Sequence, residues 1–212
     1  MKRLAALLLM LAALGSCWEL GPERPPETKD RLPPEMMERL VAEPIAAVRA
    51  HGIDAGRADF ARLLSAEEAR SGAASVEAAD LHMSFGIGLF LLRTEEELDG
   101  RALLLASRDY VHASIDLYRA AFGPGHPEVA VALHSFADIE AEIHGQRLTP
   151  AAEAALREAV RIRRATLGAR HAETRGAVRR LASLRNSEPD DSAGRAPDEA
   201  GTAVADLEAQ PE

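Results

Sequence analysis

The sequence is poor in cysteine, in aromatic residues and in positive charge, and each shortage excludes a class of protein. Cys17 is the only cysteine among 212 residues, so no intrachain disulfide can form. Aromatic residues make up 4% of the chain and β-branched residues do not alternate with polar ones over long stretches, which argues against a β-sandwich or barrel. The net charge of -9 argues against a nucleic-acid partner, because such a partner requires an excess of positive charge.

An apolar run near the N-terminus predicts an export signal. Lys2 and Arg3 precede eleven apolar residues, Leu4 to Leu14. This length suits a signal-peptide core and is too short for a helix that crosses ~30 Å of hydrocarbon. The next residues, Leu14-Gly15-Ser16-Cys17, resemble the lipobox of bacterial lipoproteins, in which the cysteine is acylated and becomes the first residue of the mature chain. The resemblance implies a signal peptide over residues 1–16 and lipidation of Cys17. The alternative is an ordinary secretory signal beside an unrelated cysteine.

The resemblance also implies a location in the bacterial cell envelope. In proteobacterial lipoproteins the residue after the cysteine directs sorting. Trp18 stands here in place of Asp, which implies the outer membrane, facing the periplasm, rather than the inner membrane. The lipid anchor at Cys17 would then make the membrane one partner of the protein.

Both ends of the chain have compositions that predict extended segments without a core. Residues 17–33 contain several prolines among alternating charges, which is typical of a stiff linker. Residues 187–212 lack aromatics and carry eight acids against one arginine. Such a segment cannot bury enough apolar surface to order itself, so we expect a disordered acidic tail.

Between these ends the sequence repeats itself, most clearly over residues 101–185. Phe122-Gly-Pro-Gly-His-Pro-Glu-Val129 is followed forty-five residues later by Leu167-Gly-Ala-Arg-His-Ala-Glu-Thr174. Each copy lies between two runs whose apolar residues have helical spacing. The order of a helix, a Gly-x-x-His turn and a second helix therefore occurs twice at a fixed spacing. Such a pattern indicates a helical repeat array. We therefore expect an all-α helical domain over residues 34–186.

Glycine, proline and capping residues predict where the individual helices begin and end. Pro44 lies inside the first helix and should kink or split it. Thr94 is expected to cap the fourth helix, with a break near its start at Gly100 as the alternative. The apolar stripes place Leu133, Phe136, Leu156 and Leu167 in the core. The expected helices cover residues 34–51, 59–70, 75–92, 94–122, 127–143, 150–167 and 172–184.

The best-defined repeat resembles a known family. The segment Glu153-Ala-Ala-Leu-Arg-Glu-Ala-Val-Arg-Ile-Arg-Arg-Ala-Thr-Leu-Gly-Ala-Arg-His171 is similar to the tetratricopeptide repeat of the kinesin light chain type, and residues 114–127 are a second instance. Here the usual repeat is lengthened by Gln146 to Thr149. The resemblance implies a short α-solenoid of antiparallel helix pairs that binds other proteins.

The same resemblance points to four residues that could bind a partner. In kinesin light chains, paired asparagines on the first helix of each repeat hold the backbone of a bound peptide. The matching positions are His134 and Ser135 in one repeat and Arg179 and Arg180 in the next. The arginines favour a partner that is an acidic protein or peptide.

The remaining polar motifs favour structural roles over catalytic ones. His126 and His171 occupy the turn position of the repeat, where a ring nitrogen can cap a helix. His134 with Asp138, and Glu140 with His144, are pairs that could bind a metal, but they point to different sides of their helix, and a catalytic zinc needs three converging ligands. The sequence has no phosphate-binding loop, His-Glu-x-x-His motif or nucleophile elbow. We therefore expect no metal, no cofactor and no enzymatic activity.

An excess of arginine near the end of the helical domain has three interpretations. It could be a solvated face, a site for the chain's own acidic tail, or a site for an acidic partner or anionic lipid headgroup. The arginines are Arg161, Arg163, Arg164, Arg175, Arg179, Arg180 and Arg185.

Together these features predict an envelope-located, non-catalytic protein-interaction module. The alternative is a structural accessory lipoprotein of a secretion, pilus or other envelope assembly, and a more distant one is an enzyme of unrecognised type.

Overall fold

A computed structural model describes residues 33–187. The predicted signal peptide, Cys17, most of the predicted linker and the acidic tail from residue 188 lie outside the described residues. Within the described range, no helix is both long enough and apolar enough to cross a membrane.

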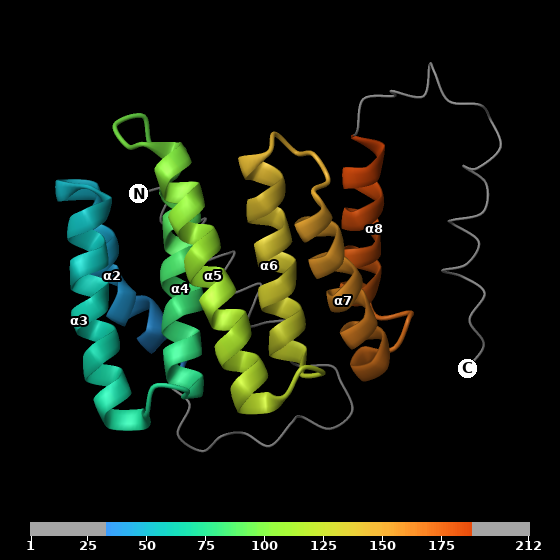
Figure 1. The fold of residues 1–212 in the computed structure, drawn as a ribbon, viewed down its shortest axis with the longest axis horizontal. Helices are drawn as coiled ribbons and strands as arrows, with labels where there is room; N and C mark the ends of the chain where they lie inside the picture. The colour runs from blue at the N-terminus through green and yellow to red at the C-terminus, as the bar shows by residue number, and fades with distance from the viewer. Residues whose placement is uncertain (1–32, 188–212) are drawn as a thin grey trace.

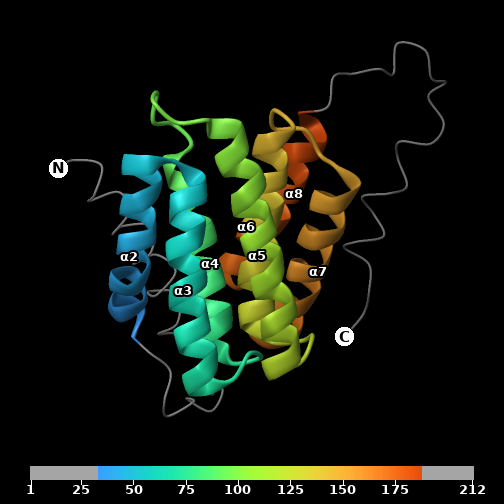
Figure 2. The ribbon, with the colours of Figure 1, turned by 60° about the vertical axis from the view of Figure 1, so that its left-hand side comes forward.

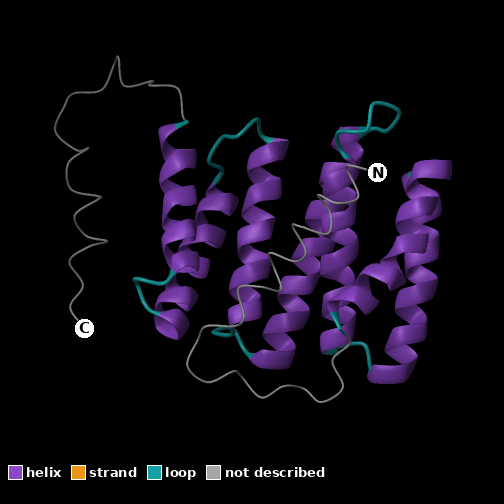
Figure 3. Ribbon diagram, turned by 180° about the vertical axis from the view of Figure 1, so that it is seen from behind, coloured by secondary structure: helices purple, strands orange, loops and turns teal. Residues whose placement is uncertain are grey.

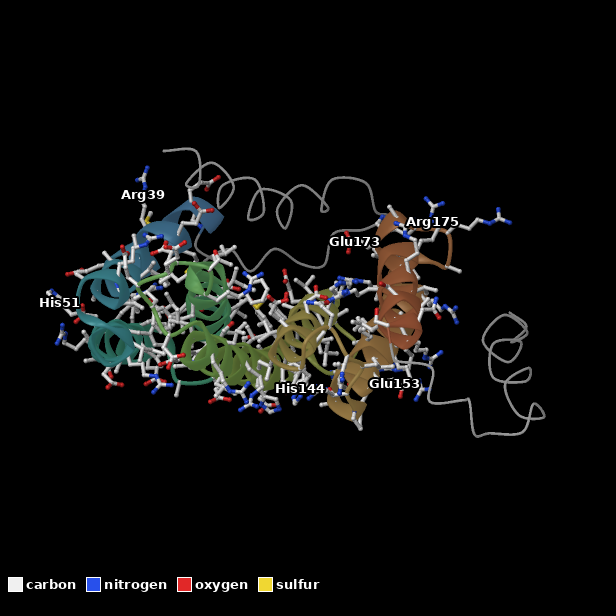
Figure 4. All side chains as sticks on the ribbon, turned by 90° about the horizontal axis from the view of Figure 1, so that it is seen from above. Arg39, His51, His144, Glu153, Glu173 and Arg175 are labelled. Carbon is white, nitrogen blue, oxygen red and sulfur yellow. The ribbon has the colours of Figure 1, made fainter. Side chains whose placement is uncertain are left out.

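Seven α-helices and no strand make up residues 33–187 (Figure 3). Successive helices run antiparallel and form an all-α solenoid (Figure 1). Seen from above, α4, α6 and α8 lie on one side of the array and α3, α5 and α7 on the other (Figure 4). Figure 2 shows α2 and α3 together at the N-terminal end. The helices are α2 (Pro34–His51), α3 (Ile53–Ser71), α4 (Val76–Leu92), α5 (Gly100–Phe122), α6 (Pro127–Ile143), α7 (Pro150–Leu167) and α8 (Ala172–Asn186).

The repeated Gly-x-x-His motif forms the same turn twice, as the sequence predicts. The glycine that ends the first helix of each turn has a positive φ, 86° at Gly123 and 84° at Gly168. The histidine three residues later accepts a hydrogen bond at Nδ1 from a backbone N–H of the next helix, at 3.3 Å in both copies. The role of His126 and His171 as helix caps is therefore confirmed.

Helix α4 lies at the centre of the domain and packs against α2, α3 and α5. Its side chains join two apolar clusters, one shared with the first helices and one shared with α5 to α8. In the second cluster Leu133 is 5% exposed and Leu156 is fully buried, whereas Phe136 is half-buried. Leu167, which the sequence places in the core, is half-buried at the end of α7 and belongs to neither cluster. The solenoid thus has a continuous core from its first helix to its last.

Two predicted helix starts are wrong. Helix α3 begins at Ile53, six residues before the expected start, because Gly52 alone reverses the chain with a φ of 89°. Helix α5 begins at Gly100, and its cap is Asp99, whose carboxylate accepts a hydrogen bond from the Ala102 N–H at 3.0 Å. The expected cap, Thr94, lies in the preceding turn.

Pro44 does not split α2, which is one helix from Pro34 to His51. Proline removes a backbone hydrogen bond, so the helix must be held by packing. Gly56 of α3 provides this packing, because its missing side chain lets α3 approach the backbone of Pro44 and the side chain of Val48 closely.

The close approach at Gly56 predicts opposite effects for two glycine-to-alanine substitutions. Both Gly56 and Gly176 lie inside helices, where alanine is favoured by about 1 kcal/mol. A Cβ at Gly56 would overlap the Val48 side chain and lie 2.8 Å from the Pro44 carbonyl oxygen, whereas one at Gly176 meets nothing within 4 Å. Overpacking costs about 1–3 kcal/mol. We expect Gly56→Ala to lower the urea midpoint of unfolding and Gly176→Ala to raise it, and a raised midpoint for Gly56→Ala would contradict the proposed helix contact.

Candidate interaction surface

Half-exposed side chains lie at helical spacing on α4 and on α6, and Arg180 of α8 contacts those on α6. On α4 they are spaced three and four residues apart, and on α6 the same spacing continues. The row mixes apolar, hydroxyl and charged groups, as protein-binding surfaces do. We call it the even-helix face, and it consists of Ser84, Ile87, Leu91, Val131, Ser135, Asp138, Glu142 and Arg180.

Ion pairs and hydrogen bonds link the three helices along this face. Arg180 of α8 donates from Nε to the Asp138 carboxylate of α6 at 2.6 Å and from Nη2 to the Gln146 side-chain oxygen at 3.0 Å. Gln146 in turn donates to Glu142 at 2.5 Å, and Glu142 accepts from Arg93 at the end of α4 at 3.2 Å. The charge of Arg180 is therefore already compensated within the molecule.

His134 lies beside this chain of contacts and faces α7. Its Nδ1 is 3.0 Å from Nη1 of Arg163, a buried arginine whose Nε is 3.6 Å from Glu173. Because a guanidinium can only donate, Nδ1 accepts, and the proton of the neutral ring is on Nε2, 3.5 Å from Asp138. Burial is the main cause of the lowered pKa of His134; Arg163 and Arg180 lower it further, and Asp138 and Glu173 oppose them. The imidazole is thus a neutral link between α6 and α7.

A segment that includes α7 matches a known family. Residues 144–173 match the family model described as tetratricopeptide repeat. This segment of the chain is a tetratricopeptide repeat. The matched segment includes all of α7 and the second Gly-x-x-His turn. A search of curated proteins finds no match to the chain. Tetratricopeptide repeats are protein-interaction scaffolds, and this is the function that the match supports.

The four residues that sequence comparison singles out do not form one site in this repeat protein. Ser135 and Arg180 both belong to the even-helix face, and His134 is three-quarters buried behind it. Arg179 is exposed and lies four residues from Arg175, on another side of α8. Their part in partner binding stays a prediction.

Sequence analysis missed the residues that neutralise Arg180. The sequence pairs Asp138 with His134 and places Gln146 in the insertion, but it links neither residue to Arg180. The insertion is the one sequence signal for this contact. In the structure Gly145 and Gln146, where the insertion begins, both have positive φ and turn the Gln146 side chain toward α8. The repeat thus uses its additional residues to tie α6 to α8.

The seven arginines near the end of the domain are not one free basic surface. Arg163, Arg180 and Arg185 each have a carboxylate within 4 Å, contributed by Glu173, Asp138 and Glu153 respectively. In Figure 4, Glu173 and Glu153 lie on opposite sides of the array. These three arginines therefore hold helices together at separate places.

Among the described residues, no group of three or more acidic, histidine or cysteine side chains could hold a metal. The two histidine–acid pairs are separate contacts, 3.5 Å between His134 and Asp138 and 3.3 Å between His144 and Glu140. A shallow cavity of about 350 Å³ lies between α2 and α3 and is lined by charges of both signs, including Arg39 and Asp59. It is far from the repeat that matches the family.

A half-buried histidine elsewhere in the repeat array predicts acid-sensitive stability. The His82 ring packs against Phe60 and Tyr110, with centroids 5.4 and 5.7 Å away, and its Nδ1 has no hydrogen-bond partner among the described residues. Arg57 interacts with Tyr110 at the edge of this cluster. Burial lowers the pKa of His82 below its ordinary value of 6.5.

A histidine with a lowered folded-state pKa binds more protons when the chain is unfolded, so stability is complete above the unfolded pKa and falls as the pH drops through 6.5. His134 acts in the same direction. We expect the urea midpoint to fall between about pH 7.5 and about pH 5.5, and His82→Phe to reduce this fall while it keeps the ring packing. The exposed His51→Gln variant is the control, and an equal fall in His82→Phe would contradict the interpretation.

Proposed function

We propose that this tetratricopeptide repeat protein is a non-catalytic adaptor of the bacterial envelope that binds another protein through the even-helix face. The observation that supports this most is the form of that face. Ile87, Leu91 and Val131 offer apolar contact, Ser84 and Ser135 offer hydrogen bonds, and all are half-exposed. Ion pairs between helices hold the side chains of the face in place before a partner binds. This preorganisation reduces the loss of conformational entropy on binding.

The partner that fits best is an extended peptide segment with acidic residues. Apolar side chains contact Ile87 and Val131, and the backbone reaches the hydroxyl of Ser135. The preference for acidic residues is weak, because Arg180 already forms an ion pair with Asp138. A carboxylate of the partner would have to displace Asp138 from this pair. Exposed pairs of this kind contribute about 0–1 kcal/mol.

The location in the envelope rests on the N-terminal sequence. Lipidation at Cys17 would tether the array to the outer membrane on its periplasmic side, and residues 18–33 would set its distance from the surface. Each buried CH₂ of an acyl chain contributes about 0.8 kcal/mol, so more than one chain gives lasting anchorage.

Affinity capture of the lipidated protein from solubilised membranes tests the proposal. Three versions are compared: the wild type, Ser135→Arg, which places a long charged side chain in the even-helix face, and Arg161→Ala, an exposed position on α7. We expect a partner that is retained by wild type and Arg161→Ala and lost from Ser135→Arg. A stoichiometric, salt-resistant complex would identify a structural subunit of an assembly instead. Equal capture by all three versions would contradict the role of the even-helix face.

A further inference from the structure

Helix α8 is the first half of a repeat whose second half is not among the described helices. In the forty-five-residue repeat, α8 is the counterpart of α6, and Thr174 corresponds to Val129. On α6, the positions that face α7 are Ala130, His134, Ala137 and Ala141; the three alanines are fully buried, and His134 contacts Arg163 of α7. On α8 the same positions are exposed, and no described helix covers them (Figure 4).

The residues at these positions of α8 differ from those of α6. The difference argues against a further helix that packs on α8 as closely as α7 packs on α6. The small alanines of α6 let α7 approach closely. Two of them, Ala130 and Ala141, correspond to Arg175 and Asn186 of α8, and His134 corresponds to Arg179, whereas Ala137 corresponds to Ala182. Long polar side chains keep another helix at a distance. The face is completed by Ala182 and by Val178, which is 37% exposed although its counterpart Leu133 is 5% exposed. We call these five residues the α8 end face.

The end face carries positive charge that the described chain does not compensate. No described carboxylate lies within 4 Å of Arg175 or Arg179, while Arg163, Arg180 and Arg185 all have one. Figure 4 shows Arg175 at the end of the array, on the far side of α8 from the other helices. The face therefore fits an acidic occupant that does not need to approach closely.

We propose that the chain's own acidic segment, residues 188–212, covers the α8 end face. Charge is the first argument, because this segment has eight acids and one arginine. Position is the second, because it follows α8 directly. Twenty-five residues can extend about 80 Å, and α8 with fifteen residues is about 22 Å long, so every part of the face is within reach. Val204 and Leu207 lie among the acids and match the apolar Val178.

The attachment of this segment to α8 compensates for weak contacts. A segment that is tethered a few residues away has an effective concentration in the millimolar range, which a free acidic protein or a second copy rarely reaches. Contacts between exposed charges are screened by salt, so the cover is expected at low ionic strength and lost at high ionic strength. The proposal does not depend on what the even-helix face binds, because that face lies on another side of α8.

Zero-length carbodiimide cross-linking of the full-length protein tests this assignment. The reagent joins an amine to a carboxylate, and the chain has lysine only at Lys2 and Lys29. The variant Arg175→Lys/Arg179→Lys keeps the charge of the end face and adds two amines there. The control Arg101→Lys/Arg161→Lys adds two amines at exposed positions on α5 and α7. Mass spectrometry then measures the cross-links to residues 188–212 in about 10 mM and in about 1 M salt.

We expect a yield roughly fivefold higher from the end-face variant than from the control at low salt, which is the ratio that one exposed ion pair gives, and no difference at high salt. Equal yields at low salt would overturn the proposal. An equal mixture of ¹⁴N- and ¹⁵N-labelled protein identifies contacts between copies, because intrachain cross-links never join a ¹⁴N peptide to a ¹⁵N peptide. Cross-links of which about half are such mixed pairs would assign the face to a second copy. Cross-links found only to another protein in membranes would assign it to an external acidic partner.

Discussion

A Leu156→Ala chain is expected to unfold at a much lower urea concentration than the wild type. Leu156 is fully buried in the cluster that joins α5 to α8, and truncation of such a leucine costs about 2–5 kcal/mol. A domain of this size has about 5–15 kcal/mol of stability in total. The substitution should therefore remove a large part of the folding free energy without a change in the folding unit, residues 34–186.

Met36→Ala is the matched control for this measurement. Met36 is 44% exposed, so its truncation should change the free energy of unfolding by about 0.5 kcal/mol or less. Equal urea midpoints for wild type and Leu156→Ala would mean that α7 does not pack against α6 as described.

Replacement of Cys17 by serine is expected to have the largest effect on location. Without the thiol no lipid can be attached, and no helix among residues 33–187 is long and apolar enough to cross a membrane. We expect Cys17→Ser in the soluble fraction and the wild type in the membrane fraction after a high-salt wash. Ser16→Ala, which keeps a small residue before the cysteine, should behave as wild type. A Cys17→Ser protein that stays with membranes after the wash would contradict the lipoprotein interpretation.

The turns of this protein could be predicted from the sequence because their determinants are local. Gly123 and Gly168 end helices through their own backbone freedom, and Thr149 caps α7 with a hydrogen bond to a residue three positions away. Such features depend on a few neighbouring residues. The repeat can therefore be recognised before any packing is known.

The features that sequence analysis missed depend on contacts between helices. Gly56 lies before the expected start of the second helix at residue 59, and only its close approach to the backbone of Pro44 shows why α3 includes it. Arg180 looks like a free basic group, and only the packing of α8 against α6 shows that Asp138 binds it. Residues forty-two positions apart do not reveal such a pair without the register of the two helices. The fold was therefore easier to predict than the charge of the candidate site.

The most direct test of the central claim is site-specific photo-cross-linking in intact cells. A benzophenone amino acid is placed at Ser135, on the even-helix face, or at Arg161, on the exposed side of α7. We expect a discrete higher-mass protein adduct when the cross-linker is at Ser135 and none when it is at Arg161. An adduct from Arg161 alone, or no adduct from either position, would contradict the claim that the protein binds a partner through its even-helix face.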